Sequence, residues 1–458
     1  MARAGRSVLL LEKTPRAGTK VLASGGTRCN LTTTLDATRA AELFGRDGAR
    51  FLGPAFRALS PMDLREHFAA LGVETVEEAL EKVFPKTGGA RAVRDALERD
   101  ARDAGVKLLF DCGVEAIVPL GPGGAAVGPR RSGTAEIGPR GSGAAASGSS
   151  GIAVPGGSGV AVPEPRRSGV PAPLRGSAGW EVTLASGSII RCARLIVCPG
   201  GKSYPRTGTT GDGYGWLAAL DLPIVEPVPA LVPLSSPAKW VRELAGVSLQ
   251  DVEARLVDAK GTTLGKRRRP VLFTHKGVSG PGAMDLSAPV ARAEAGARRG
   301  GERAPLFHLM LDLVPELTRE ELRAAFVDAA GRPGAPSFAR ALPSAPPKRI
   351  LDVVARRAGL VSSDLRANQL DRESRHLLVE TLKGLAVEID GTLGFDQAEV
   401  TAGGLALSHV DRGTMRVKGF ENLYACGEIL DLTGPIGGLN FQSAFATAEL
   451  AARDAARG

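Results

Sequence analysis

The chain has 458 residues, of which 43% are hydrophobic and 23% charged, a balance typical of a globular protein with more than one core. No apolar run is long enough for a membrane span, and the N-terminal apolar stretch is too short for a signal peptide. The five cysteines include no C-x-x-C pair, which argues against a zinc site or a disulfide framework and favours a cytoplasmic location.

The formal net charge of +9 raises the question of a nucleic-acid partner. Residues 119–179 hold six arginines and two glutamates, so +4 of the charge lies in this segment and +5 in the rest of the chain. A second basic cluster, residues 266–269, stands directly before Pro270 and a strand-like run, which is typical of a solvated strand end. Aromatic residues make up 4% of the chain and form no stacking platform, so we do not expect nucleic acid as a partner.

The first part of the chain alternates strand and helix patterns. Residues 7–12 form an apolar run that ends in Glu12, as in a parallel strand that is apolar on both faces. The sequence Ser-Pro-Met-Asp at 60–63 is a strong helix start, with a serine cap, a first-turn proline and an acid at the third position. Residues 91–103 predict a second helix and residues 106–111 a second strand.

Residues 119–179 consist almost entirely of Gly, Pro, Ser, Ala and Arg. Such a composition buries too little apolar surface to offset its ordering entropy, so we expect a disordered insert. It separates two strand-like pieces, residues 114–118 and 180–184, and we interpret it as a hairpin loop lengthened by insertion. A partner-binding tail is the alternative.

Beyond the insert, the pattern moves from α/β to β-rich, then to helical, and back to α/β. A Thr-Arg-Glu-Glu capping box opens the helical part, which we expect to continue to Leu385. The predicted elements are a hairpin of 180–184 with 188–191, a strand at 195–198, a helix at 213–220, β structure over 225–313, helices over 318–385, a strand at 423–426 and a helix from Asn440.

Glu12 has the position of a ribose-binding acid. In a Rossmann unit, the acid that ends the second strand takes the adenosine ribose about twenty residues after a glycine loop. Only eleven residues precede Glu12, and the first six look like the end of a helix. We therefore expect that the first strand and its glycine loop are missing, through a misplaced start rather than a genuine deletion.

A second candidate segment runs from Lys20 to Asn30. Its glycines and small polar residues, together with two cations, concentrate hydrogen-bond donors as an anionic, planar cofactor requires. A buried structural turn would not need so many donors. The candidate ligands are Lys20, Ser24, Gly25, Gly26, Arg28, Cys29 and Asn30, with a buried, inert thiol as the alternative role for Cys29.

Together with three later motifs, at 200–213, 273–281 and 427–442, this segment resembles the HI0933-like family of FAD-dependent, NAD(P)-linked oxidoreductases. The four motifs occur in the family's order over essentially the whole chain, and the low-complexity insert is no part of the pattern. The resemblance implies FAD as the cofactor.

The resemblance also implies roles for two glycine-containing motifs near the C-terminal end of the chain. Gly427 and Glu428 follow a strand and place a carboxylate on the flavin ribityl side. Gly437 and Gly438 precede a helix near Asn440, whose N-terminus would face the isoalloxazine and stabilise negative charge on it. The alternative is that these glycines merely turn the chain.

The pair Gly200 and Gly201 resembles the glycines that pass close to the dinucleotide in related flavoproteins. For Asp212 we expect a helix cap rather than direct ligation. His275 is the candidate general acid, because it is a titratable group within a family motif. The alternative is a histidine that hydrogen-bonds its own turn, with Ser279 and Pro281 starting a helix.

The expected fold is α/β, with a Rossmann-like FAD-binding domain, N-terminally incomplete, that encloses an inserted β-rich domain and a small helical subdomain. The expected boundaries are 1–118, 180–224 and 392–458 for the FAD-binding domain, 119–179 for the insert, 225–315 and 386–391 for the β-rich domain, and 316–385 for the helical subdomain.

These features predict an FAD-dependent oxidoreductase that transfers hydride through flavin N5 to or from a small organic molecule. No second strand–glycine loop–helix unit is visible, so NAD(P)H is expected to dock transiently as the donor. Some members of the family reduce conjugated keto-steroids. The alternatives are a flavin-less truncated remnant that acts as a scaffold or binding protein and, ranked last, a tRNA-modifying flavoprotein. We expect no metal site, and the sequence does not indicate an oligomeric state.

Overall fold

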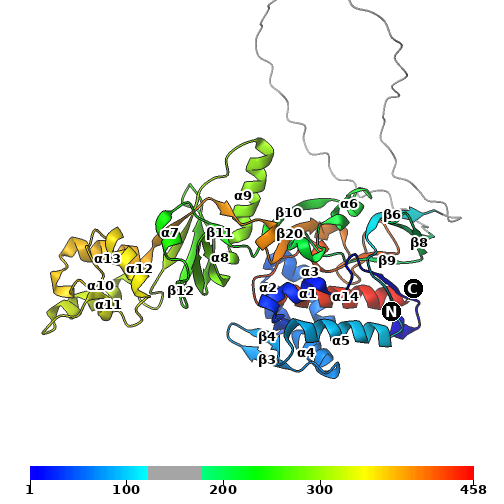
Figure 1. Cartoon of the computed structure of the whole chain (residues 1–458), viewed down its shortest axis with the longest axis horizontal. Coiled ribbons are helices and arrows are strands. Elements are labelled where there is room, and N and C mark those ends of the chain that lie inside the picture. Colours follow the sequence, from blue (N-terminus) through cyan, green and yellow to red (C-terminus); the bar gives the residue numbers. More distant parts are fainter. Residues whose placement is uncertain (122–177, 458) are drawn as a thin grey trace, which may run out of the picture.

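The computed structural model of the protein describes residues 1–121 and 178–457. The predicted insert at 119–179 therefore lies almost entirely outside the described residues. Figure 1 shows an elongated arrangement, with the α/β elements at one end, β-sheets in the middle and a group of helices at the other end.

The α/β part contains two parallel strand pairs. Strand β1 (Leu9–Leu11) pairs with β5 (Lys107–Leu109), and β9 (Leu195–Val197) pairs with β21 (Leu423–Ala425). In the described part of the chain, the two pairs form separate two-stranded sheets. Leu9 and Leu10 keep 39% of their surface exposed, so the expected burial of β1 on both faces is wrong, because β1 has a single strand neighbour.

The α/β part also contains helices and short antiparallel strands (Figure 1). Helix α14 packs against α3, and α5 packs against α1. The elements of this part are α1 (Thr19–Ala23), β2 (Thr32–Thr33), α2 (Ala37–Glu42), α3 (Gly45–Ala58), α4 (Pro61–Ala70), β3 (Thr75–Glu78), β4 (Lys82–Pro85), α5 (Gly89–Asp103), α6 (Asp212–Ala218), β10 (Ile224–Ala230), β20 (Val400–Leu405) and α14 (Leu439–Arg457).

The predicted hairpin after the insert is confirmed. Strands β6 (Val114–Leu120), β7 (Gly179–Leu184) and β8 (Ile189–Cys192) form an antiparallel meander. The buried Trp180 side chain anchors it, since its indole N–H donates to Asn422 Oδ1 at 2.9 Å.

Two of the three predicted helix caps are confirmed. Ser60 and Thr318 each accept a hydrogen bond from the third residue of their helix, in reciprocal capping boxes. Asp212 is not a cap: it is the first residue of α6, which follows a left-handed Gly211. Its carboxylate instead accepts from Lys13 Nζ at 2.6 Å and from Thr210 Oγ1 at 2.7 Å.

Two antiparallel sheets form the middle of the molecule, and the second one packs on the helical group. One sheet has the strand order β12-β15-β16-β11-β19 and the other β14-β13-β17-β18. The elements are β11 (Leu234–Ser235), α7 (Lys239–Glu243), β12 (Ser248–Leu249), β13 (Glu253–Val257), β14 (Thr263–Arg268), β15 (Val271–Thr274), β16 (Gly277–Ser279), α8 (Pro281–Met284), α9 (Ser287–Gly300), β17 (Phe307–Asp312), β18 (Leu385–Ile389) and β19 (Gly391–Thr392).

The helical group consists of α10 (Arg319–Gly331), α11 (Phe338–Ala341), α12 (Lys348–Arg357) and α13 (Arg372–Lys383). Its buried side chains, such as Phe326 and Val354, belong to the same hydrophobic cluster as Leu309 and Val387 of the sheet. The expectation that helix continues to Leu385 is wrong, because Leu385 already begins β18, whose alternate residues are buried.

Among residues 1–121 and 178–457, no helix combines the length and the apolar character needed to cross a membrane.

Candidate functional site

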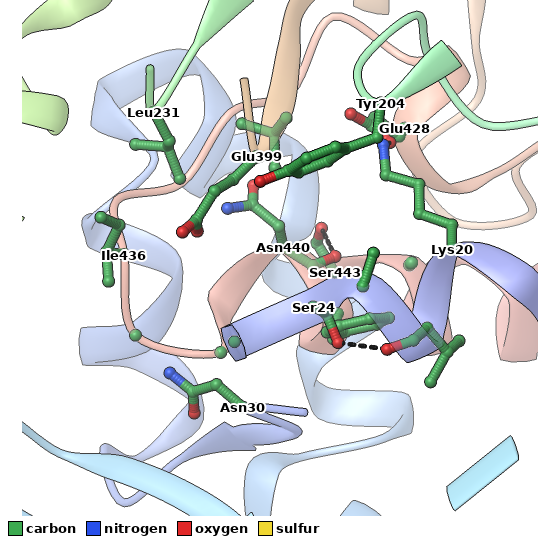
Figure 2. Close-up of a pocket in the computed structure, with 18 of the residues that line it drawn as sticks. Lys20, Ser24, Asn30, Tyr204, Leu231, Glu399, Glu428, Ile436, Asn440 and Ser443 are labelled. Carbon is green, nitrogen blue, oxygen red and sulfur yellow. Dashed lines mark hydrogen bonds and ion pairs between the residues drawn. The ribbon is translucent and has the colours of Figure 1, made fainter. Parts of the chain in front are cut away.

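A cavity of about 650 Å³ opens where the α/β part meets the inserted sheet (Figure 2). Its volume lies within the range of about 300–1,000 Å³ that is usual for ligand sites. Residues from many segments line it: Lys20, Val21, Ala23, Ser24, Gly25, Arg28, Asn30, Lys82, Phe84, Cys198, Gly200, Tyr204, Leu231, Leu272, Ser279, Gly280, Pro281, Met284, Glu399, Val400, Cys426, Gly427, Glu428, Leu432, Ile436, Gly437, Gly438, Asn440, Phe441, Ser443, Ala444 and Ala448.

The candidate segment from Lys20 to Asn30 forms one wall of this cavity. Five of its seven candidate ligands line the cavity, and the exceptions are Gly26 and Cys29. Gly25 has a left-handed φ of 54°, and a Cβ there would lie 3.1 Å from the Asn30 amide nitrogen. The segment therefore needs glycine at this turn to bring its backbone to the cavity wall.

Cys29 faces the core instead of the cavity. Its side chain is fully buried beside Leu31 and Phe68. Burial raises the pKa of the Cys29 thiol to about 11. The structure thus places this cysteine as the buried thiol that was the alternative interpretation.

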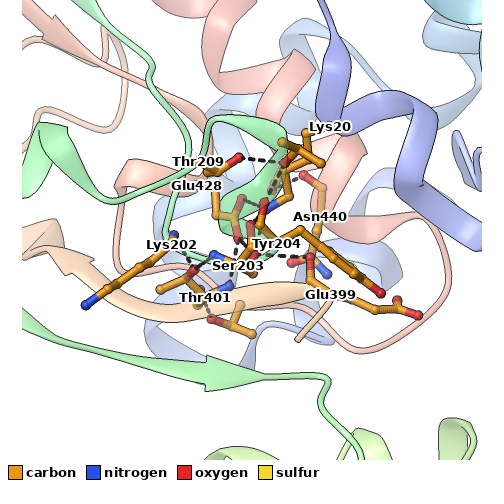
Figure 3. A network of polar contacts seen from close by, with 12 residues as sticks. Lys20, Lys202, Ser203, Tyr204, Thr209, Glu399, Thr401, Glu428 and Asn440 are labelled. Atoms are coloured by element: carbon orange, nitrogen blue, oxygen red, sulfur yellow. Dashed lines mark hydrogen bonds and ion pairs between the residues drawn. The ribbon is translucent and has the colours of Figure 1, made fainter. Parts of the chain in front are cut away.

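Lys20 and Glu428 form an ion pair inside a polar network (Figure 3). Lys20 Nζ lies 2.9 Å from Glu428 Oε2 and donates to Ser203 Oγ at 2.6 Å. Glu428 Oε1 accepts from the Thr401 amide at 2.7 Å. The lysine charge is therefore neutralised within the protein, and the network holds the Glu428 carboxylate at the cavity wall.

The two glycines after β9 have different surroundings. Gly200 lines the cavity, whereas Gly201 does not. A Cβ on Gly201 would lie 2.4 Å from Thr401 Oγ1, which also accepts the Lys202 amide hydrogen bond at 2.7 Å. Gly201 therefore permits close packing of β20 on the strand end, and only Gly200 is placed to approach a ligand.

The glycine-rich loop before α14 forms the opposite wall. Gly438 has a φ of 81°, and a Cβ there would lie 2.2 Å from the Thr32 carbonyl oxygen. A Cβ on Gly437 would meet no atom within 4 Å. Asn440 ties the loop together, since its side-chain amide bonds both the N–H and the C=O of Gly434 at 2.9 Å.

The inserted part holds this loop from outside. The Asp285 carboxylate, which is fully buried, accepts the Ile436 amide hydrogen at 2.8 Å. Arg269 Nη1 donates to the Ile436 carbonyl at 2.6 Å and lies 3.5 Å from Asp285. Burial raises the pKa of Asp285, and the hydrogen bond from Ile436 and the charge of Arg269 only partly oppose it. Both backbone polar groups of Ile436, a residue that lines the cavity, are therefore fixed by residues of the inserted part.

Tyr204 and Glu399 were not predicted as site residues. Both line the cavity, and their side chains extend side by side in the two close-ups (Figures 2 and 3). Burial, and secondarily the charge of Glu399, raises the pKa of Tyr204. The side chain of Glu399 is exposed to the cavity, but the protein around it and the charge of Asp285 raise its pKa, while Lys82 opposes the shift. Tyr204 stands within a motif already identified, but Glu399 has no sequence signal, because it is an isolated acid before a strand.

The carboxyl ends of the neighbouring strands β9 and β21 carry Cys198 and Cys426. Both cysteines line the cavity. A hydrogen bond from the Cys426 thiol lowers the pKa of Cys198, and the same contact raises the pKa of Cys426. The sequence showed these two cysteines only as scattered residues. Their proximity arises from the parallel pairing of β9 with β21, which joins segments that are far apart in the chain.

Besides Gly26, Cys29 and Gly201, two further predicted site residues lie outside the cavity. Glu12 ends β1 and accepts hydrogen bonds from the Thr14 amide at 2.7 Å and hydroxyl at 2.9 Å. His275 is exposed in the turn between β15 and β16, while Leu272 and Ser279 line the cavity from the other end of that hairpin. The structure therefore does not bring His275 to the cavity. Of the alternative interpretation, Pro281 does begin a helix, whereas Ser279 ends strand β16.

The walls of this cavity fit a flavin dinucleotide. The N-terminus of the 19-residue helix α14 follows Gly437 and Gly438 at the cavity, and its free N–H groups favour negative charge there. The absence of a Cβ at Gly437 leaves room for a planar ring to approach the backbone, whereas the absence of a Cβ at Gly438 lets the loop pack on the Thr32 carbonyl. Within the described part of the chain, no group of three His, Cys, Asp or Glu side chains could hold a metal ion.

Known proteins resemble this chain over most of its length. A family model described as HI0933-like protein Rossmann domain matches residues 1–123 and 173–454. The 3-dehydro-bile acid delta(4,6)-reductase of Clostridium scindens is 26% identical over 98% of this chain and 92% of its own length. The ribosomal RNA dihydrouridine synthase of Haemophilus influenzae is 25% identical over 98% of this chain and 92% of its own length. That of Escherichia coli is 29% identical over 59% of this chain and 62% of its own length.

Among solved structures, 3-ketosteroid delta1-dehydrogenase from Sterolibacterium denitrificans has 12% identity and a TM-score of 0.45, over 100% of this chain and 96% of its own. The family match and the reductase relative identify the chain as a flavin-dependent oxidoreductase. The chain belongs to the HI0933-like family.

Proposed function

We propose that the protein reduces a carbon–carbon double bond conjugated to a carbonyl group in a small organic molecule. The observation that carries this proposal is the cavity, in which the glycine-rich loop before α14 meets apolar side chains. Leu231, Leu272, Met284 and Ile436 would contact an apolar substrate beside the loop. FAD bound there would supply hydride from its N5 atom.

The family relatives support the type of reaction. One is named for reduction at the Δ4,6 positions of a 3-dehydro bile acid, and two are named for synthesis of dihydrouridine. A 4,6-dien-3-one and a uracil ring share one feature, a C=C bond polarised by a carbonyl. We therefore infer that hydride addition to such a bond is also the reaction of this chain.

The residues of the chain have separate tasks in this proposal. Gly437 and Gly438 would present backbone N–H groups toward the cofactor. Glu428, held by Lys20 and Ser203, gives the cavity wall a fixed carboxylate for hydroxyl groups. NAD(P)H is the proposed electron donor, and it would dock transiently at the cavity mouth.

Reduction of a uridine in ribosomal RNA is the second candidate, because it uses the same chemistry and two relatives carry that name. The two candidates differ in the size of the substrate that must enter. They also differ in salt dependence, because binding of an RNA backbone weakens steeply with ionic strength and binding of a bile acid does not.

The test begins with the absorption spectrum of the purified chain with and without added FAD. Anaerobic NADH and NADPH are then added, followed by either a 3-dehydro-Δ4,6 bile acid or a ribosomal RNA transcript. Reoxidation of the flavin with a two-hydrogen mass gain in the bile acid supports the first candidate. The same gain in uridine supports the second. A chain that binds no FAD contradicts both candidates.

A further inference from the structure

Tyr204 is held in a rigid, unusual backbone conformation at the cavity. Its φ of 51° and ψ of 61° lie in the left-handed region, which bulky residues rarely adopt. Its N–H donates to the Phe395 carbonyl at 3.0 Å, and its C=O accepts from the Thr207 amide at 2.8 Å and hydroxyl at 2.7 Å. Strain of this kind persists where surrounding contacts impose it, commonly at active sites.

The phenol of Tyr204 is directed into the cavity rather than into the core (Figure 2). Glu399 is its acidic neighbour, contributed from the chain just before β20. The charged groups that face Glu399 are Asp285, after α8, and Lys82, at the start of β4. A phenol and a carboxyl group thus stand together on the wall that also carries the apolar side chains.

We propose that Tyr204 is the proton donor to the substrate and that Glu399 returns a proton to Tyr204. This inference rests on the proposed reduction of a conjugated double bond. Such a reduction needs a hydride at the β-carbon and a proton at the α-carbon, and His275, the acid expected from sequence, lies outside the cavity.

The proton balance is as follows. FAD bound at the cavity would supply the hydride that the β-carbon gains, and the π electrons of the C=C bond would move toward the carbonyl. The Tyr204 O–H bond then breaks as the α-carbon gains the proton. The phenolate takes a proton from the Glu399 carboxyl group, which is restored by water. The raised pKa values of both groups keep them protonated to higher pH than usual, as proton donors require.

The variants Tyr204→Phe and Glu399→Gln test this assignment in the FAD-supplemented chain. Tyr424→Phe is the matched control, because it removes a hydroxyl that donates to Asp454 at 2.8 Å in a buried position outside the cavity. Flavin absorption bands and bleaching by NAD(P)H are measured first and are expected to be unchanged in all three. Reoxidation of the pre-reduced flavin by a 3-dehydro-Δ4,6 bile acid is then timed.

Tyr204→Phe should slow reoxidation by about 10²- to 10⁴-fold, the usual loss for a general acid, while Tyr424→Phe stays at the wild-type rate. Glu399→Gln should remove the decline in rate that the wild type shows as pH rises through the pKa of Glu399. A second readout is ultraviolet difference titration of tyrosine ionisation. Glu399→Gln should lower the pKa of one tyrosine, and that titration should be missing in Tyr204→Phe.

Turnover by Tyr204→Phe at the wild-type rate overturns the assignment while the proposed function stands. A wild-type chain that binds FAD and accepts electrons, yet never reduces the bile acid, overturns the proposed function and this inference with it. A tyrosine titration that Glu399→Gln leaves in place contradicts the coupling of the pair.

Discussion

Replacing Gly438 by alanine in the loop before α14 should destabilise the protein in two ways, through backbone strain and through a steric overlap. A left-handed φ costs a non-glycine residue about 1–2 kcal/mol. In addition, the new Cβ would lie 2.2 Å from the Thr32 carbonyl oxygen. Relief of such an overlap requires backbone movement, and overpacking typically costs about 1–3 kcal/mol more. We therefore expect a loss of about 2–5 kcal/mol in the free energy of unfolding.

Thr32 has little freedom to move away. Its side chain is buried and donates to Gln442 Oε1 at 2.6 Å, and Gln442 Nε2 donates to the Leu59 carbonyl at 2.7 Å. The strain should therefore displace the Gly437–Gly438 backbone instead. A shift of about 1 Å in such a loop can cost 10²-fold in function, so FAD affinity should fall at least about tenfold.

Gly72→Ala is the matched control, since Gly72 has a φ of 83° and no atom within 4 Å of its Cβ position. It should lose only the left-handed cost of about 1–2 kcal/mol. Urea unfolding measures the stability of both variants, and quenching of flavin fluorescence measures FAD affinity. Equal losses in the two variants, with wild-type FAD affinity in Gly438→Ala, would refute the close packing on Thr32.

Three further outcomes are expected. Asp285→Ala should cost about 1–3 kcal/mol in urea unfolding, because it leaves the partly buried Ile436 N–H without its acceptor. Asp285→Asn keeps an acceptor and should retain most of that stability, and equal losses in the two variants would contradict the role of this hydrogen bond. The pKa of Glu399 is raised in the folded state, so its ionisation at higher pH should destabilise the wild type relative to Glu399→Gln. The loss of stability should occur as pH rises from the unfolded-state pKa of the carboxyl group through its folded-state pKa. A stability difference that does not change with pH would argue against the shift. A thiol reagent should modify the exposed Cys198 in the native protein and the buried Cys29 only after unfolding, as peptide mapping would reveal.

The sequence determined the features that depend on short stretches of chain. The Ser60 and Thr318 capping boxes and the β7–β8 hairpin follow from side chains that bond to their own neighbouring backbone, so local pattern suffices. The ordered glycine motifs also predicted the family and most of the cavity-lining segments, because a backbone that approaches a cofactor must lack side chains.

Only the tertiary structure decided which distant side chains meet. The pairing of Lys20 with Glu428, and the approach of Tyr204 to Glu399, join residues that no local pattern relates. The position of His275 outside the cavity was also decided by tertiary structure. The β15–β16 hairpin places His275 in its turn, while Leu272 and Ser279 of the same motif lie at the other end, at the cavity. Long-range contacts arise from the packing of whole helices and strands. The type of a single residue therefore does not indicate which distant residue it will contact.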